Sequence, residues 1–298
     1  MKKVIFAALG LCICGIAAWF LARRETAQVP VDHPQLDAGV ALQDVSFYSQ
    51  ALKRQMPYRV FLPAKVAAGQ KMPVVFLLHG GNGGYRDWSN YSDVSQYAAT
   101  SKSGGLILVM PEGAFSYYQN AALKPEDKYE DYLTNDLIPD VESRFPVATG
   151  KENRAMIGIS MGGFAAIKLA LARRNLFSFV GALSPSIDIL HRRFNIKRTG
   201  EWWRVRNIFG PMGSASRQSM DPIVLVQSAD PALTPYIYLG AGEQEPLLDP
   251  NRRFASRLKE RHFTYEFHTK PGGHDWNEWD AQIPGCFDSL LEHLKRRS

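Results

Sequence analysis

Apolar residues along the chain fall into short unbroken runs that alternate with longer amphipathic stretches. The unbroken runs have the length of strands buried on both faces of a sheet. We therefore expect strands at residues 73–80, 104–113, 155–160, 179–185, 236–242 and 264–272. Helical spacing is clearest in between, at residues 129–145, where Leu133, Leu137, Val141 and Phe145 recur every four positions. Further helices are expected at residues 85–101, 164–174, 251–261 and at the end of the chain.

This alternation predicts an α/β fold with a mostly parallel central sheet and helices on both faces. Two segments before it, residues 45–52 and 56–63, are rich in β-forming residues and are separated by only three positions. We expect these two segments to pair as an N-terminal antiparallel hairpin. Residues 44–298 then form one domain.

The first 24 residues have a different pattern. Lys2 and Lys3 precede an apolar run that ends at Arg23 and is about long enough to cross a bilayer. This pattern predicts a signal anchor or a cleaved signal peptide, and either would export the protein to the periplasm or cell envelope. An uncleaved segment would attach the chain to the membrane. Residues 25–43 contain two prolines and no periodicity, which is typical of a linker.

Residues 187–222 interrupt the alternation with a long, basic stretch that is rich in aromatic residues. Insertions of this length in a compact domain are often lids or binding loops. The alternative is a pair of short helices packed on the sheet edge. Both interpretations fit the pattern.

Composition narrows the possible functions. The chain has 298 residues, 45% hydrophobic and 21% charged, which is typical of a globular protein. Part of its net charge of +6 lies in short runs at the two ends, and no basic stripe interleaved with aromatic residues runs through the body, so we expect no nucleic-acid partner. Cys286 is the single cysteine after residue 14, which excludes an internal disulfide or a cysteine metal site there.

One serine lies between an expected strand and an expected helix. Gly158, Ser160 and Gly162 match the pattern G-x-S-x-G, in which a serine nucleophile occupies a tight turn. The turn is so sharp that side chains two positions before and after the serine would collide, which explains both glycines. The backbone N–H of Met161, directly after the serine, would face the reacting carbonyl.

A glycine-rich loop after the first predicted parallel strand offers a second donor. His79, Gly80 and Gly81 follow that strand, and the Gly81 N–H is the candidate partner of Met161 in an oxyanion hole. The general base should be a histidine after the last strand. Of the seven histidines, only His274 lies on a glycine-rich loop between the last strand and the last helix.

The third member of such a triad should be a carboxylate that follows the strand at residues 236–242. Glu243, Glu245 and Asp249 are all in this region, and spacing alone does not choose between them. The carboxylate orients the imidazole and stabilises its protonated form, a role that Glu fills as well as Asp.

In these motifs the chain resembles the putative-esterase family of α/β-hydrolases. That family includes S-formylglutathione hydrolase (esterase D), acetyl and feruloyl esterases and the mycobacterial mycolyltransferases. The blocks that carry the resemblance include "VVFLLHGGNGGYRDW", "AMIGISMGGFAAIKLAL" and "PGGHDWNEW". It implies the α/β-hydrolase fold, Ser160 as nucleophile and His274 as base. The family's acid usually follows the pattern G-x-x-D. In this chain Glu245 takes the place of that Asp, and the mycolyltransferases also use a Glu.

The resemblance also implies further roles. Gly81 and Met161 fall at the oxyanion-hole positions, and Tyr118 and Asn120 match a Tyr-x-Asn that lines the substrate pocket. The predicted activity is hydrolysis of a small-molecule or glycan carboxylic ester through an acyl-enzyme, a reaction that needs no metal or cofactor. Two alternatives are acyl transfer to a sugar or lipid alcohol and a non-catalytic binding protein on the same scaffold.

Overall fold

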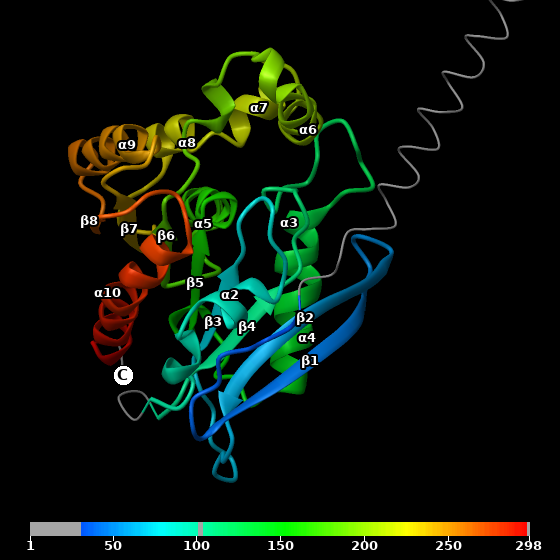
Figure 1. The fold of residues 1–298 in the computed structure, drawn as a ribbon, viewed down its shortest axis with the longest axis vertical. Coiled ribbons are helices and arrows are strands. Elements are labelled where there is room, and N and C mark those ends of the chain that lie inside the picture. Colours follow the sequence, from blue (N-terminus) through cyan, green and yellow to red (C-terminus); the bar gives the residue numbers. More distant parts are fainter. Residues whose placement is uncertain (1–30, 101–103, 297–298) are drawn as a thin grey trace, which may run out of the picture. The chain divides into compact units, whose positions relative to one another are not determined.

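The alternating strands assemble into one eight-stranded sheet in the computed structural model, which describes residues 31–100 and 104–296 (Figure 1). The sheet belongs to the unit that spans Pro34–Ser298. Its strands, in spatial order, are β1 (Val40–Ser49), β2 (Arg54–Pro63), β4 (Ile107–Pro111), β3 (Val74–Leu78), β5 (Arg154–Ile159), β6 (Phe179–Leu183), β7 (Tyr236–Gly242) and β8 (Tyr265–Lys270).

Strand directions confirm the predicted fold class. The β1–β2 hairpin is antiparallel, β2 pairs antiparallel with β4, and all remaining neighbours from β4 to β8 are parallel. Parallel strands bring their carboxyl ends to one edge of the sheet, where sites in such folds lie. The hairpin begins at Val40, so the last residues of the predicted linker 25–43 belong to the sheet.

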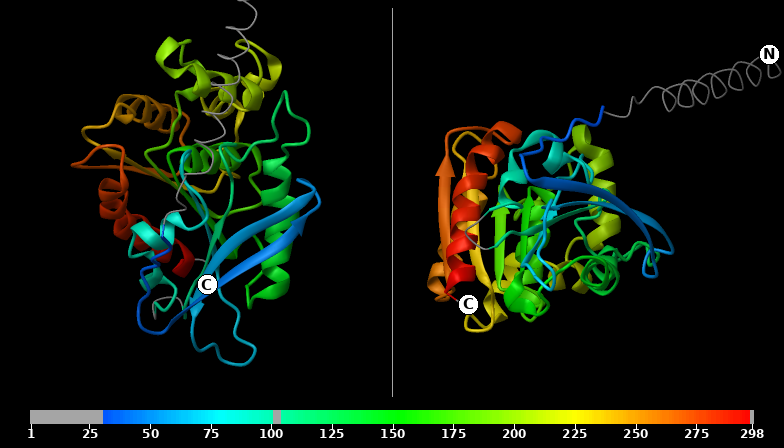
Figure 2. Two further views of the ribbon diagram at one scale, coloured as in Figure 1. Left: turned by 45° about the vertical axis from the view of Figure 1, so that its right-hand side comes forward. Right: turned by 90° about the horizontal axis from the view of Figure 1, so that it is seen from below.

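Helices cover both faces of the sheet, as the continuous apolar strands require (Figure 2). On one face α10 (Trp276–Lys295) and the short α2 (Asp87–Tyr91) pack with strand residues such as Val75 and Leu77. On the other face lie α3 (Tyr129–Asp131), α4 (Ile138–Arg144), α5 (Met161–Ala172) and α9 (Leu248–Glu260), packed with Val74, Phe76 and Leu78.

Two of the predicted helices are irregular. The expected helix at 85–101 is only α2 and a 3₁₀ turn, η1 (Val94–Tyr97), because Ser92 is extended and its hydroxyl donates to the carbonyl of Trp88 at 2.6 Å. The expected helix at 129–145 contains a π-helical segment, η3 (Tyr132–Leu137), between α3 and α4. Pro139 follows it and has no N–H to donate to the carbonyl four residues earlier, which fits the local widening of the helix.

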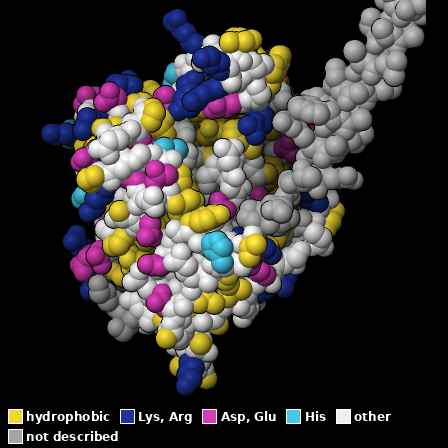
Figure 3. All heavy atoms as spheres, in the orientation of Figure 1, with side chains coloured by type: hydrophobic (Ala, Val, Ile, Leu, Met, Phe, Trp, Pro, Cys, Tyr) yellow, Lys and Arg dark blue, Asp and Glu magenta, His cyan; other side chains and the backbone are white. Residues whose placement is uncertain are grey.

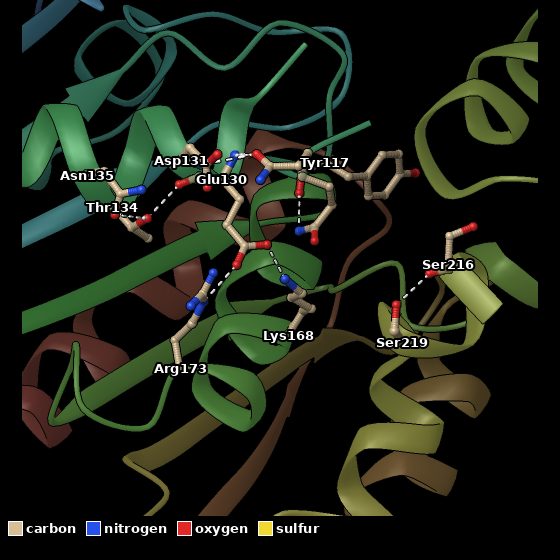
Figure 4. A network of polar contacts seen from close by, with 11 residues as sticks. Tyr117, Glu130, Asp131, Thr134, Asn135, Lys168, Arg173, Ser216 and Ser219 are labelled. Atoms are coloured by element: carbon tan, nitrogen blue, oxygen red, sulfur yellow. Dashed lines mark hydrogen bonds and ion pairs between the residues drawn. The ribbon is translucent and has the colours of Figure 1, made fainter. Parts of the chain in front are cut away.

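A buried ion cluster ties α3 to α5. Figure 4 shows the Lys168 and Arg173 side chains pointing to the Glu130 carboxylate, with Arg173 Nε at 3.0 Å. Burial opposes the charge on Glu130, but the two cations keep its pKa below the ordinary value. Helix α5 begins directly after Ser160. The cluster therefore also helps to fix the position of the helix that follows this serine.

Residues 187–222, named the cap here, form short helices at the top of the view in Figure 1. They contain the turns η5 (Ile189–His191) and η6 (Ile196–Arg198), then α6 (Thr199–Phe209) and α7 (Ala215–Ser219), and lead into α8 (Pro222–Ser228). Phe209 is fully buried and packs against Tyr117 and Phe164, with ring centroids 5.2 and 5.4 Å away. The cap is therefore anchored to the body by a hydrophobic contact.

No helix within residues 31–100 and 104–296 is long and apolar enough to cross a membrane. The predicted targeting segment, residues 1–24, lies outside the described residues, and so does the linker up to residue 30.

Candidate active site

Ser160 occupies the sharp turn between β5 and α5. Its backbone has φ of 51° and ψ of −108°, a conformation that few side chains adopt. A Cβ added to Gly158 would come within 2.3 Å of the Gly162 backbone, and one added to Gly162 would lie 2.4 Å from the carbonyl oxygen of Leu78. Both glycines are therefore required by the close approach of the turn to its neighbours.

A continuous series of hydrogen bonds links Ser160 to a histidine and a carboxylate. His274 Nε2 lies 2.8 Å from Ser160 Oγ, and His274 Nδ1 lies 2.6 Å from Glu245 Oε2. The Glu245 side chain is fully buried, whereas His274 keeps 31% of its side chain exposed. The three groups follow the carboxyl ends of β5, β7 and β8, which the parallel sheet brings to one edge.

The structure distinguishes the three candidate acids by position. Glu245 Oε1 accepts a hydrogen bond from the N–H of Gly242 at 3.1 Å, so the G-x-x-Glu spacing turns the carboxylate back over the end of β7. Glu243 instead accepts from the Thr269 hydroxyl at 3.2 Å, and the exposed Asp249 pairs with Arg252 at 3.7 Å. Of the three, only Glu245 contacts His274.

The loop of the carboxylate and the loop of the histidine are joined by Gln244. Its backbone N–H donates to the carbonyl of Gly272 at 2.9 Å, and its side-chain oxygen accepts from the N–H of the same glycine. Trp279 of α10 packs edge-on against the His274 ring, with centroids 5.0 Å apart. The imidazole is thus held between a fixed acid and an aromatic wall.

Gly81 and Met161 line the same cavity as Ser160, which has a volume of about 590 Å³. Met161 is the first residue of α5, where a backbone N–H has no partner within the helix. The loop of Gly81 is held by His79, whose Nε2 accepts from the N–H of Gly113 at 2.9 Å and whose Nδ1 therefore donates to the carbonyl of Gly80 at 2.7 Å. His79 supports this loop from a fully buried position.

Tyr118 and Asn120 lie outside the lining of this cavity. Tyr118 is fully buried, and its hydroxyl accepts from the backbone N–H of His79 at 3.2 Å, so it supports the Gly81 loop from behind. Asn120 Oδ1 accepts from the N–H groups of Glu130 and Asp131 at the start of α3. Both residues were expected to line the substrate pocket. In the structure they support the surrounding loops and do not line the cavity.

Comparison with known proteins places this chain in a family. The sequence profile of the family described as Putative esterase matches residues 49–289. The chain belongs to this esterase family. It is 25% identical over 264 residues to an acetyl esterase of Caldicellulosiruptor saccharolyticus, an alignment that covers 84% of this chain and 97% of the relative.

Solved structures show the same fold. The fluorophosphonate-binding serine hydrolase F of Staphylococcus aureus superposes with a TM-score of 0.74 at 23% identity, covering 85% of this chain and 99% of that structure. The S-formylglutathione hydrolase of the same organism superposes with a TM-score of 0.72 at 23% identity over the same shares of the two chains. At these identities the similarity shows the fold alone.

Among the cavity residues that the sequence analysis did not name, two lie close to the triad or replace a predicted residue. Ser186 follows β6, and its hydroxyl lies 3.4 Å from Ser160 Oγ while its N–H donates to the Ser160 carbonyl at 3.2 Å. Tyr117, whose hydroxyl interacts with Ser186, lines the cavity where Tyr118 was expected. The signal for Ser186 was its place at the end of the strand next to β5, the edge at which the triad residues were sought.

A second carboxyl group lies close to Glu245 and His274. Glu278 of α10 is 1% exposed, and its carboxylate accepts hydrogen bonds from Gln282 and, at 3.4 Å, from Ser184. Burial, reinforced by the negative charge of Glu245, raises the pKa of Glu278 to about 7. The acid side of the site therefore contains one carboxylate bound to the histidine and a second carboxyl whose ionisation is costly.

Proposed function

We propose that this protein is a serine carboxylesterase that acts through an acyl-enzyme, with Ser160 as nucleophile, His274 as base and Glu245 as acid. The observation that carries the proposal is the hydrogen-bonded series Ser160–His274–Glu245, which begins on a strained turn at the sheet's carboxyl edge. Serine, base and orienting acid at these separations are the arrangement that nucleophilic acyl transfer requires.

The geometry suggests a role for each group. His274 Nε2 takes the proton of Ser160 Oγ as the oxygen attacks the ester carbonyl, and Glu245 accepts a hydrogen bond from Nδ1–H and stabilises the imidazolium. The N–H groups of Gly81 and Met161 stabilise the oxyanion of the tetrahedral intermediate. His274 then protonates the leaving alcohol, and water activated by the same histidine releases the acid.

The cavity and the relatives support an ester of a small acid as the substrate class. A volume of about 590 Å³ accommodates a small ester group. Among similar proteins are an acetyl esterase and a ferulic acid esterase, whose names describe esters of small acids. We place the reaction outside the cytoplasm, on the basis of the sequence pattern of residues 1–24.

The decisive experiment removes the nucleophile. Ser160→Ala should lower kcat for 4-nitrophenyl acetate by roughly 10⁴-fold or more while leaving the melting temperature close to that of the wild type. A fluorophosphonate probe should label the wild type at Ser160 and leave the variant unlabelled. Activity that persists in Ser160→Ala would overturn the mechanism, and a wild type that neither turns over nor takes the label would favour a non-catalytic binding protein.

Product analysis separates hydrolysis from acyl transfer. Reactions are run with and without an added sugar or lipid alcohol, and the free acid and the new ester are quantified. We expect the free acid to remain the main product at every alcohol concentration. A new ester that replaces the acid as the alcohol is raised would make the protein a transferase that uses the same three residues.

A further inference from the structure

The cap that borders the active-site cavity is strongly basic. Residues 187–222 contain seven Lys and Arg and three Asp and Glu, an excess of four positive charges in a chain whose net charge is +6. Figure 3 shows Lys and Arg side chains gathered at the top of the molecule, where the cap lies in Figure 1. Three of these arginines line the cavity that contains Ser160: Arg192, Arg198 and Arg204.

Two of the three cavity arginines are paired with carboxylates that also line the cavity. Arg192 binds Asp188 through Nη2 at 2.9 Å and reaches Glu201 at 3.7 Å. Arg198 reaches the other oxygen of Glu201, also at 3.7 Å. Since Asp188 and Glu201 together carry two negative charges, they balance these two arginines and leave nothing for the third.

Arg204 is the third. Its guanidinium lies over the ring of Phe115, 4.0 Å from the centroid, and no carboxylate of the described residues forms an ion pair with it. Phe115 in turn lies against Gly81, because a Cβ on that glycine would come within 3.0 Å of the ring. A cation without a carboxylate partner is therefore held, through one aromatic ring, beside the glycine proposed for the oxyanion hole.

We propose that the cavity binds an ester that carries a carboxylate group, and that Arg204 is the counter-ion of that group. This inference rests on the proposed esterase function and narrows its substrate class. The three arginines and two carboxylates leave the lining with a net charge of +1, which matches one carboxylate better than a phosphate of nearly two charges. Arginine suits the role because its planar guanidinium binds a carboxylate through two parallel hydrogen bonds.

The test compares matched pairs of esters in which a free carboxylate is replaced by its methyl ester. One pair places the carboxylate in the alcohol part, 4-acetoxybenzoate and its methyl ester. The other places it in the acyl part. It consists of the 4-methylumbelliferyl monoester of adipic acid and the mixed diester in which the second carboxyl is a methyl ester. The readout is the ratio of kcat/KM for the charged ester to kcat/KM for its neutral counterpart, at low salt. We expect the wild type to prefer the charged member of at least one pair by about tenfold.

A matched variant is available on the same helix. Arg206 also belongs to α6, but its guanidinium stacks on Trp203 at 5.4 Å and it does not line the cavity. Arg204→Gln should remove most of the preference, mainly through KM, and Arg204→Lys should restore part of it. Arg206→Gln should keep the wild-type ratio.

The outcomes separate this proposal from the one on which it rests. If the wild type hydrolyses the neutral esters and shows no preference in either pair, the carboxylate proposal is overturned and the esterase function remains. Equal loss of preference in Arg204→Gln and Arg206→Gln would mean that the summed positive charge of the cap sets the preference. That result would also overturn the carboxylate proposal. If no ester of either kind is hydrolysed, the esterase function itself fails.

Discussion

The carboxyl edge of the sheet and the cap both contribute to the same cavity, but they hold their side chains in different ways. At the edge, Glu245 is fully buried and the hydrogen bonds from Ser160 to His274 to Glu245 are 2.8 and 2.6 Å long. In the cap, Arg198 is 65% exposed and its ion pair with Glu201 spans 3.7 Å. The edge fixes the geometry of its side chains, whereas the cap holds part of its charge, such as Arg198, in exposed and longer ion pairs.

Catalysis and substrate preference therefore depend on different parts of the protein. Charges that are buried and fixed act at low effective dielectric and are expensive to disturb, while exposed ion pairs contribute little to stability. Substitutions at the edge should therefore destroy the reaction or the fold, and substitutions in the cap should change substrate preference without loss of the folded state. Single substitutions on the two sides of the cavity test that division.

After removal of Ser160 itself, Glu245→Gln should produce the largest loss of activity at the edge. Glutamine keeps the shape of the side chain but removes the charge that stabilises the imidazolium, and it can present an N–H to His274 Nδ1 in place of an acceptor. We expect kcat to fall by roughly 10³- to 10⁴-fold. The measurement is steady-state hydrolysis of 4-nitrophenyl acetate.

Asp249→Asn is the matched control for this prediction. Asp249 lies only four residues later, is 75% exposed and pairs at the surface with Arg252. Its substitution should leave kcat within about twofold of the wild type. The reverse pattern, with activity retained in Glu245→Gln and lost in Asp249→Asn, would mean that Asp249 is the acid in solution.

Gly158→Ala should destabilise the protein without touching a catalytic side chain. The added methyl group would lie 2.3 Å from the backbone of Gly162, which cannot move without opening the turn that holds Ser160. We expect a loss of about 3 kcal/mol or more and a melting temperature lower by roughly 6 °C or more, or failure to accumulate as soluble protein. A soluble variant with an unchanged melting temperature would show that the turn is less tightly packed than the structure indicates.

Much of the edge was predictable from the sequence, because its constraints are local. The glycines around Ser160 are required by the close approach of the turn to its neighbours, and the mostly parallel sheet follows from the alternation of apolar runs with helices. The order Ser160, Glu245, His274 follows the strands β5, β7 and β8. Once the G-x-x-D position of the family was applied, even the choice of Glu245 required no knowledge of the three-dimensional structure.

The features that the sequence could not show depend on side-chain direction. Tyr117 and Tyr118 are neighbours with the same chemistry, and both have positive φ, 54° and 52°. This unusual backbone places Tyr117 on the cavity and Tyr118 in the core, and the usual periodicities of helix and strand do not apply to it. The balance of charges in the cap was hidden for a similar reason, since the 3.7 Å pair of Arg192 with Glu201 depends on how α6 packs against the turns before it.

Glu278→Gln should stabilise the protein at alkaline pH. The pKa of Glu278 is raised from 4.5 to about 7 in the folded state, so the folded state binds its proton more tightly than the unfolded state. The wild type therefore loses stability as pH rises through this window, and the loss persists above pH 7. Removing the ionisable group should raise the free energy of unfolding by about 2 kcal/mol at pH 8 and by less than about 0.5 kcal/mol at pH 5.

Urea unfolding at the two pH values measures this difference, and the same helix supplies a control. Glu292 of α10 is 59% exposed and pairs with Lys295 at 3.2 Å, so Glu292→Gln should change stability by the same small amount at both pH values. The groups that face Glu278 are Glu245, His274, Ser184 and Gln282. A gain that is equal at pH 5 and pH 8 would show that it comes from packing and that ionisation of Glu278 is not its cause.

Gly200→Ala is the smallest change and tests the cap side of the comparison. Gly200 is exposed in the first turn of α6, and a Cβ added there would meet nothing within 4 Å. Alanine restricts the unfolded chain more than glycine does, so the substitution should stabilise the protein by about 0.5 to 1 kcal/mol and raise the melting temperature by about 1 to 3 °C. Activity on neutral esters should stay within about twofold of the wild type. The same glycine-to-alanine change that is costly at Gly158 would then be favourable at Gly200, because the surroundings of Gly158 leave no room for a side chain and those of Gly200 do. A lower melting temperature in Gly200→Ala would instead show that α6 depends on the backbone freedom of this glycine, and that the cap is as constrained as the edge.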